Sequence, residues 1–413
     1  MPPANPNFNP NPTSTPAPAQ AISTQQPSSA QLPTSAQLPT SRVPHALADV
    51  GTYGRGAGPN VVVLGVGQMG LVCAGLLASE GAAATPAGPI QHVQRPCRVV
   101  MWAHSRDEAG QLAQTRMSGR LPGFLLPPAV HVALQDEDAL RDAALIVSAI
   151  PVQYIRETWK RLAPFVGRDV PVLSVAKGIE NGTLMRPTQV VADVLRSSNR
   201  DNPDGRPRAI GTLSGPTIAA ELARCMPAAM IAASDDQAFA RQVQTLFGST
   251  WMRVYTHPDM LGVELAGAVK NVIAIAAGVL DGLQAGNNAK SALLARGLAE
   301  ISRLGTAMGA STETFFGVAG VGDLATTCFS PEGRNRSLGE ALGKGAKLDA
   351  YLAASPYVVE GVATTKSVVE LARKFRVDMP IVAAVHTVLF EGVDPVEAIG
   401  LLMSRTPKPE NVG

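Results

Sequence analysis

The stretch NVVVLGVGQMG at positions 60–70 decides the fold class. Its four consecutive apolar residues, 61–64, are typical of a strand that is buried on both faces of a parallel sheet. Gly65, Gly67 and Gly70 then give the spacing GxGxxG where a helix should begin. In such a unit the first glycine permits the tight turn, the second lets the backbone approach a pyrophosphate, and the third lets the helix pack closely. We therefore predict a dinucleotide-binding turn, and the alternative is a glycine turn with a structural role only.

Similar apolar runs recur along the next 150 residues. We expect a helix at about 69–79 and further strands at 99–102, 145–150, 171–176 and 209–213. Strands that alternate with helices indicate a doubly wound, parallel, Rossmann-like α/β sheet. The Gly-, Ala- and Pro-rich segment 81–95 is expected to be a loop. After about His257 the chain becomes Ala- and Leu-rich with Gly-rich turns, which predicts an all-α C-terminal substrate domain.

Length and composition favour a two-domain enzyme. The chain has 413 residues, 46% of them hydrophobic and 16% charged, which suits a large packed interior. Lys and Arg number 35 against 33 Asp and Glu, so no global field recruits nucleic acid. We expect a disordered Pro/Ser/Thr-rich tail over 1–58, an NAD(P)-binding Rossmann domain over 59–256, an α-helical substrate-binding and catalytic domain over 257–405, and a short tail over 406–413.

The N-terminal segment differs from the rest of the chain. Residues 1–41 carry no charged side chain, and the hexapeptide AQLPTS at 30–35 repeats at 36–41. Such a segment cannot bury a core, so we expect disorder. A targeting peptide is the alternative, but a basic region followed by an apolar one is missing. A Pro-rich tail also suits partner docking, although such tails are more often linkers.

The cysteine and hydropathy patterns indicate whether the protein binds metal, where in the cell it works and whether it spans a membrane. The four cysteines form no CxxC pair and have no histidine at ligand spacing, so we expect no metal and no disulfide framework. That usage fits a reducing, cytoplasmic location. The nearest approach to a membrane span, 266–280, contains Lys270 and Asn271, and we expect no span.

The end of the second expected strand bears on cofactor choice. An NAD-selective site usually has an acid here for the ribose hydroxyls. This chain instead has His104, Ser105 and Arg106 after the strand. These side chains can accommodate a 2′-phosphate, so we expect NADP(H) as well as NAD(H), unless Arg106 is simply solvated.

Two further strand ends carry polar residues. Lys177 follows the run at 171–176, and Gly215, Pro216 and Thr217 follow the run at 209–213. Because ligands gather at the carboxyl ends of parallel strands, Lys177 should face the cofactor crevice; the alternative is a surface lysine. Pro216 is expected to start a helix whose N–H groups favour an anion, unless this is an ordinary N-cap.

Lys270 is the best acid–base candidate. It lies in the stretch 263–275, which is apolar on almost every helical face and should be buried. Burial lowers a lysine pKa toward the range of proton exchange with an alkoxide. The alternatives are a lysine that reaches the surface or one that pairs with Glu264.

The same region offers partners for Lys270 and for a phosphate. Asp323, with Thr327 one helical turn later, can orient the lysine or accept a substrate hydroxyl. A basic turn at 333–336 includes Arg334, whose guanidinium suits a phosphate. A helix cap and a solvated charge cluster are the alternatives.

Together these motifs resemble the NAD(P)-dependent glycerol-3-phosphate dehydrogenase family, from about Asn60 to about Arg405. The matching segments, in family order, are GVGQMG (65–70), AKGIE (176–180), SGPTIAAEL (214–222), ELAGAVKNVIAIAAG (264–278), GVGDLATTC (320–328), RNRSLG (334–339) and VVEG (358–361). Departures from the family pattern stand at Gln68, Met69 and Gly333, and the segment 81–95 and the N-terminal tail lie outside it.

The resemblance implies reduction of dihydroxyacetone phosphate to sn-glycerol 3-phosphate for phospholipid synthesis, in a homodimer. It implies that Lys270 acts as general acid in reduction and as base in oxidation, with Lys177, Asp323 and Thr327 as further catalytic residues. The implied substrate-binding residues are Lys177, Gly215, Thr217, Lys270, Asp323, Gly333, Arg334 and Asn335. The implied cofactor-binding residues are Gly65, Gly67, Gln68, Met69, Gly70, His104, Arg106, Lys177, Ala219, Arg334, Val358 and Glu360.

Two rival functions remain. One is a related two-domain dehydrogenase acting on a β-hydroxy acid or a ketopantoate-like substrate, against which the Arg334–Asn335 pair favours a phosphorylated substrate. The other is a non-catalytic NADPH-binding sensor. The presence of Lys177, Lys270 and Asp323 together argues against it.

Overall fold

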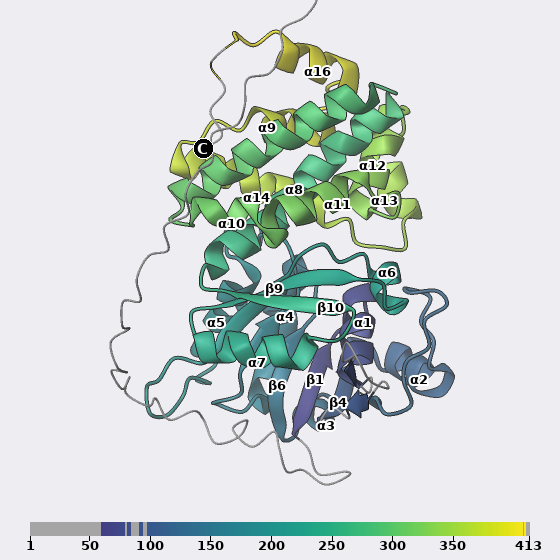
Figure 1. Ribbon diagram of the computed structural model, residues 1–413, viewed down its shortest axis with the longest axis vertical. Coiled ribbons are helices and arrows are strands. Elements are labelled where there is room, and N and C mark those ends of the chain that lie inside the picture. Colours follow the sequence, from purple (N-terminus) through teal and green to yellow (C-terminus); the bar gives the residue numbers. More distant parts are fainter. Residues whose placement is uncertain (1–58, 79–80, 84–90, 94–96, 408, 410–413) are drawn as a thin grey trace, which may run out of the picture. The chain divides into compact units, whose positions relative to one another are not determined.

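The computed structural model describes residues 59–407 and 409, apart from 79–80, 84–90 and 94–96. The expected tail over 1–58 and its repeat lie outside these residues. The main element is an eight-stranded sheet of order β10-β9-β8-β7-β6-β1-β4-β5 (Figure 1). Its strands are β1 Asn60–Leu64, β4 Arg98–Trp102, β5 His131–Ala133, β6 Ala143–Ser148, β7 Val172–Ser174, β8 Ile210–Ser214, β9 Ala228–Ser234 and β10 Met252–His257.

Strand β1 is central and buried, as its sequence predicts. It pairs in parallel with β4 on one side and β6 on the other, so that Val61 faces both Val99 and Leu145. Val61 and Val63 belong to the hydrophobic core on one face of the sheet, and Val62 and Leu64 to the core on the other. Because successive side chains point to opposite faces, an apolar run of this kind needs helices on both sides.

Helices cover both faces. Residues of α1 (Gln68–Ala78), α2 (Arg106–Thr115) and α7 (Gln237–Phe247) belong to the first core. Residues of α4 (Val152–Leu162) and α5 (Pro187–Ser197) belong to the second. The expectation of a doubly wound α/β sheet is therefore confirmed.

The sheet differs from the prediction in one pairing. Strand β8 pairs antiparallel with β9, whereas the other neighbouring pairs of this sheet are parallel. Strands β5, β9 and β10 were not predicted from the sequence: β5 is short and β10 mixes polar and apolar residues, whereas β9 is apolar over 228–233 but Ala-rich, and alanine is depleted in strands. The helix expected at Pro216 begins later, because α6 spans Ala219–Ala223 with Ile218 as its N-cap.

The segment 81–95 is not wholly a loop, and that prediction was wrong at its two ends. Strand β2 (Gly81–Ala83) pairs antiparallel with β3 (Gln91–Val93). Backbone hydrogen bonds between the ends of the segment form this ladder without the apolar alternation that marks a strand in sequence.

Beyond β10 the described chain is helical. The helices are α8 Met260–Gly282, α9 Gly286–Ala307, α10 Thr312–Phe316, α11 Asp323–Phe329, α12 Arg334–Gly343, α13 Leu348–Ala354, α14 Glu360–Phe375, α15 Pro380–Phe390 and α16 Pro395–Met403. The expected basic turn at 333–336 is instead the N-cap and first turn of α12. A short π-helical turn at Val318–Gly322 precedes α11.

Helix α8 is the core of this helical part. It is long and apolar enough to cross a membrane by composition, yet 89% of its most apolar window is buried inside the protein, as in the core helix of a globular fold. Helix α12 packs against it almost backbone to backbone. A Cβ on Gly339 would lie 1.9 Å from the carbonyl oxygen of Ile275, so this close approach requires glycine.

Candidate active site

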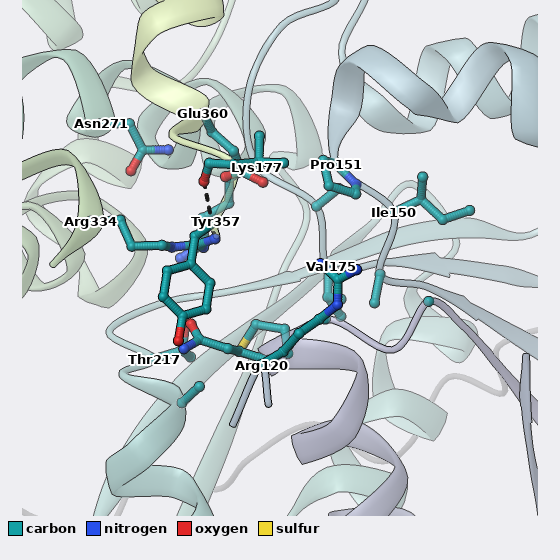
Figure 2. Close-up of a pocket in the computed structure, with 18 of the residues that line it drawn as sticks. Arg120, Ile150, Pro151, Val175, Lys177, Thr217, Asn271, Arg334, Tyr357 and Glu360 are labelled. Carbon is teal, nitrogen blue, oxygen red and sulfur yellow. Dashed lines mark hydrogen bonds between the residues drawn. The ribbon is translucent and has the colours of Figure 1, made fainter. Parts of the chain in front are cut away.

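A cavity of about 820 Å³ runs from the glycine turn after β1 to the helices that follow β10. Figure 2 shows Arg120 from the sheet part and Arg334 and Tyr357 from the helical part around it. The predicted site residues that line the cavity are Gly65, Gly67, Gln68, Met69, His104, Lys177, Thr217, Ala219, Lys270, Asp323, Thr327, Gly333, Arg334, Asn335, Val358 and Glu360. Gly70, Arg106 and Gly215 do not line it.

The glycine turn has the geometry that a pyrophosphate needs. Gly65 has a φ of 108°, a conformation that L side chains rarely adopt. A Cβ on Gly70 would lie 1.9 Å from the carbonyl oxygen of Gly65, so a side chain there would collide with the turn. A Cβ on Gly67 would meet nothing within 4 Å, which leaves open space over the backbone at the start of α1. The residues present therefore fit a dinucleotide phosphate.

Two lysines converge on one carboxylate at the other end of the cavity. Asp323, the first residue of α11, is 1% exposed. Lys270 on α8 donates to its Oδ1, and Lys177, which follows β7, donates to its Oδ2 at 2.7 Å. Lys270 Nζ also lies 2.6 Å from Thr327 Oγ1, whose own hydroxyl donates to the carbonyl oxygen of Asp323 at 2.7 Å. These hydrogen bonds therefore hold the four side chains in place relative to one another.

Burial is the main influence on Lys270. Desolvation, with a smaller repulsion from Lys177, outweighs the attraction of Asp323 and lowers the pKa of Lys270 to about 7. The alternative pairing with Glu264 was wrong. Glu264 accepts instead from Arg186 Nη1 at 2.5 Å and from the hydroxyl of Thr188 at 2.7 Å.

Lys177 is positioned by a residue that had been expected to bind substrate. Its Nζ donates to the carbonyl oxygen of Gly215 at 3.0 Å. Gly215 has a φ of 137°, and a Cβ there would lie 3.0 Å from the carbonyl oxygen of Ala229 on the neighbouring strand. This backbone conformation presents the Gly215 carbonyl to the lysine.

The start of α12 forms another wall. Arg334 donates to the carbonyl oxygen of Val358 at 3.1 Å. Asn335 is buried, and its Oδ1 accepts from the backbone N–H of Gly361 at 2.9 Å. Burial raises the pKa of Glu360, against the opposing charges of Arg334, Lys177 and Lys270. An anion in this corner therefore meets a helix N-terminus and fixed cations.

The end of the cavity next to β4, where the cofactor ribose was expected, differs from what the sequence suggested. His104 lines it, but Arg106 donates to Gln135 Oε1 at 2.7 Å. Two other guanidinium groups, those of Arg120 and Arg161, line this end instead.

Sequence reasoning missed several lining residues: Arg120, Tyr154, Arg161, Asn271, Thr326 and Tyr357. For Asn271 a signal existed, because it is a second polar residue beside Lys270 in an apolar helix. Thr326 lies inside the segment GVGDLATTC, and Tyr357 directly precedes VVEG, so their positions were also indicated. Arg120, Tyr154 and Arg161 lie in segments whose local pattern gives no sign of a cavity.

A doubly wound sheet with this glycine turn, facing a buried amine of lowered pKa, defines a dinucleotide-dependent dehydrogenase. The family models described as the N-terminus and the C-terminus of NAD-dependent glycerol-3-phosphate dehydrogenase match residues 60–240 and 259–400. The chain belongs to this family, and it is an oxidoreductase that uses NAD(H) or NADP(H).

Individual relatives agree with this assignment. The chain is 41% identical to a glycerol-3-phosphate dehydrogenase [NAD(P)+] of Mycobacterium tuberculosis over 356 residues, covering 86% of this chain and 99% of that one. It is 42% identical to one of Prosthecochloris aestuarii over 351 residues, covering 85% and 99%. The crystal structure of glycerol-3-phosphate dehydrogenase from Coxiella burnetii matches with a TM-score of 0.75 and 31% identity, covering 84% and 99%.

Proposed function

We propose that this chain catalyses the reversible reduction of dihydroxyacetone phosphate to sn-glycerol 3-phosphate, with Lys270 as the proton donor. The observation that carries the proposal is the sharing of the Asp323 carboxylate by Lys270 and Lys177, inside the cavity that begins at the glycine turn. Such a cluster can protonate and stabilise an oxygen that becomes an alkoxide.

When bound, the nicotinamide supplies a hydride to C2 of the substrate. The developing alkoxide takes its proton from the Lys270 ammonium, so one hydride and one proton convert the carbonyl to the alcohol. A pKa of about 7 lets Lys270 donate in reduction and accept in oxidation near neutral pH. Lys177 remains close by as a second positive charge, and Asp323 and Thr327 hold Lys270 in place.

The substrate phosphate is proposed to bind at the start of α12, beside Gly333, Arg334 and Asn335, with Thr217 of the same cavity as a further contact. The Arg334 guanidinium offers paired donors to phosphate oxygens, and the α12 N-terminus adds positive potential. These features favour a phosphorylated substrate over the unphosphorylated acids of the rival dehydrogenases.

The cofactor is proposed to bind along the turn from Gly65 to Gly70 and against Ala219, Val358 and Glu360. A catalytically silent sensor would need the turn but would have no use for the two lysines on Asp323. Their presence supports turnover.

Family membership supports the wider setting. We propose a cytoplasmic homodimer that supplies the glycerol phosphate backbone of phospholipids. We also propose a domain boundary near 256, where the last strand ends and α8 follows. Light scattering on the purified full-length protein tests the oligomeric state.

The deciding experiment is loss of NADH or NADPH absorbance with dihydroxyacetone phosphate. Wild type is compared with Lys270→Ala, with unphosphorylated dihydroxyacetone as the substrate control. Lys344→Ala, at the exposed C-cap lysine of α12 outside the cavity, is the matched control variant. Turnover that needs both the substrate phosphate and Lys270 supports the proposal. If the wild-type protein binds NADPH but does not turn over, the proposal is wrong and the non-catalytic sensor becomes the better interpretation.

A further inference from the structure

Arg161 is held rigidly at the end of the cavity where β4 terminates. It comes from the last turn of α4, and its Nε and Nη2 donate to the two oxygens of Asp136 at 2.6 and 2.7 Å. Its guanidinium carbon lies 5.5 Å from the ring centroid of Trp102, and its Nη1 donates to the carbonyl oxygen of His104 at 3.1 Å. Three contacts therefore fix the plane of this guanidinium.

The fixed guanidinium still has hydrogen-bonding capacity. Its three donor bonds leave one N–H on each terminal nitrogen outside the contacts just described. The side chain lines the cavity and is 43% exposed, so a ligand can reach these groups. A planar guanidinium with two adjacent donors is well suited to a phosphate group.

Two acids near Arg161, Asp136 and Glu108, are already held by other side chains. A third, Glu157 on α4, lines the cavity and is paired with the exposed Lys160. Asp136 accepts from Trp102 Nε1 at 2.9 Å as well as from Arg161. Burial alone would raise the pKa of Asp136, but the hydrogen bonds and charges of its partners lower it, so this carboxylate is ionised and committed. Glu108, which also lines this end, is paired with Arg120 at 2.9 Å.

Position relates this site to one part of the cofactor. Strand β4 is the parallel neighbour of β1, and the adenosine ribose of a dinucleotide binds at the carboxyl end of such a strand. An acid there selects the 2′-hydroxyl of NAD, and an arginine accommodates the 2′-phosphate of NADP.

We propose that Arg161, fixed by Asp136 and Trp102, binds the 2′-phosphate of NADPH and makes this dehydrogenase prefer NADPH to NADH. Arg106, which the sequence suggested for this role, is turned to Gln135 instead. Removal of Arg161 should weaken the binding of NADPH relative to NADH in two ways. It deletes the phosphate donor, and it frees the Asp136 carboxylate to repel a phosphate and to accept ribose hydroxyls.

The test is Arg161→Gln, assayed with both cofactors. The KM for NADPH should rise about tenfold or more with little change in kcat, since the 2′-phosphate is remote from the reacting carbon. The KM for NADH should stay the same or fall. Arg168→Gln removes an exposed arginine that follows α4 and does not line the cavity, and it should leave both values unchanged.

A binding measurement separates this inference, which rests on the proposed activity, from failure of that activity. Calorimetric titration of the full-length wild-type protein should show tighter binding of adenosine 2′,5′-bisphosphate than of adenosine 5′-monophosphate, from which it differs by the 2′-phosphate alone, and Arg161→Gln should lose the difference. The double variant Asp136→Asn/Arg161→Gln, which removes the freed charge, should recover only part of the loss.

Three results would overturn the proposal. One is an equal rise in KM for both cofactors, which would assign Arg161 a merely structural role. Another is an unchanged KM for NADPH in Arg161→Gln. The third, which stands even if that variant fails to fold, is wild-type protein that binds adenosine 5′-monophosphate as tightly as the 2′,5′-bisphosphate.

Discussion

The ammonium of Lys177 donates a 2.7 Å hydrogen bond to Asp323 Oδ2 across 146 residues of chain. Lys177 follows a strand of the sheet, whereas Asp323 begins a helix of the C-terminal part. Because Lys270 donates to the other carboxylate oxygen, one buried acid holds two cations side by side. The proposed chemistry therefore depends on Asp323 as much as on the lysines.

Substitution of Asp323 by Asn should lower kcat by about 100-fold or more. The amide keeps the size of the side chain, but it leaves two largely buried ammonium groups without a counterion. Steady-state assays with thermal unfolding as a folding check measure this, with the exposed Asp349→Asn on α13 as the control. A folded Asp323→Asn protein with near-wild-type kcat would contradict the assigned role.

The pH profile should have opposite signs in the two directions. Reduction needs protonated Lys270, so its kcat should fall as the pH rises through about 7, the lowered pKa of this lysine. Oxidation needs the neutral amine and should fall as the pH drops through the same range. Initial rates in both directions between pH 5.5 and 9 give the comparison, and parallel profiles would exclude Lys270 as the group that exchanges the proton.

Substitution of Gly70 by Ala should weaken NADPH binding and destabilise the fold. The added Cβ would lie 1.9 Å from the carbonyl oxygen of Gly65, so the turn must open. Gly110→Ala on α2, where a Cβ meets nothing within 4 Å, is the matched control and should be neutral or stabilise by up to about 1 kcal/mol. Titration of nucleotide fluorescence and thermal unfolding measure both effects, and unchanged NADPH affinity in Gly70→Ala would refute the prediction.

Titration of the buried Glu300 should lower the free energy of unfolding of the protein as the pH rises from 4.5 to about 7. Its buried carboxylate accepts from the backbone N–H groups of Ile381 and Val382 at the start of α15. Burial outweighs these bonds and raises its pKa from 4.5 to about 7. Between these values the folded state holds a proton that the unfolded state has released, so the contribution to stability is full below 4.5 and is lost by about 7.

Thermal unfolding of wild type and Glu300→Gln across this pH range tests the linkage. The variant should lose less stability than wild type as the pH rises, because its side chain does not titrate. The exposed Glu370→Gln should follow wild type. Identical pH dependence in wild type and Glu300→Gln would show that this carboxyl does not carry the effect.

Local sequence patterns correctly predicted the elements that interactions between neighbouring residues determine. The apolar run 61–64 and the glycines after it specified β1, the turn and α1, because burial on both faces and backbone sterics act within a few residues. The apolar helix around Lys270 likewise indicated a buried amine. Strand β9 was missed although 228–233 is apolar, because its four alanines favour a helix more than a strand. Its antiparallel pairing with β8 is set by tertiary packing.

The sequence by itself therefore determined the fold class, the dinucleotide turn and the identity of the buried lysine. Only the tertiary structure decided which groups meet: Lys177 and Lys270 on one carboxylate, the Gly215 carbonyl on Lys177, and Arg161 rather than Arg106 at the cavity. The physical reason is the range of the forces. Backbone sterics and side-chain periodicity act between neighbours in sequence, whereas an ion pair depends on where packing places segments that are distant in the chain.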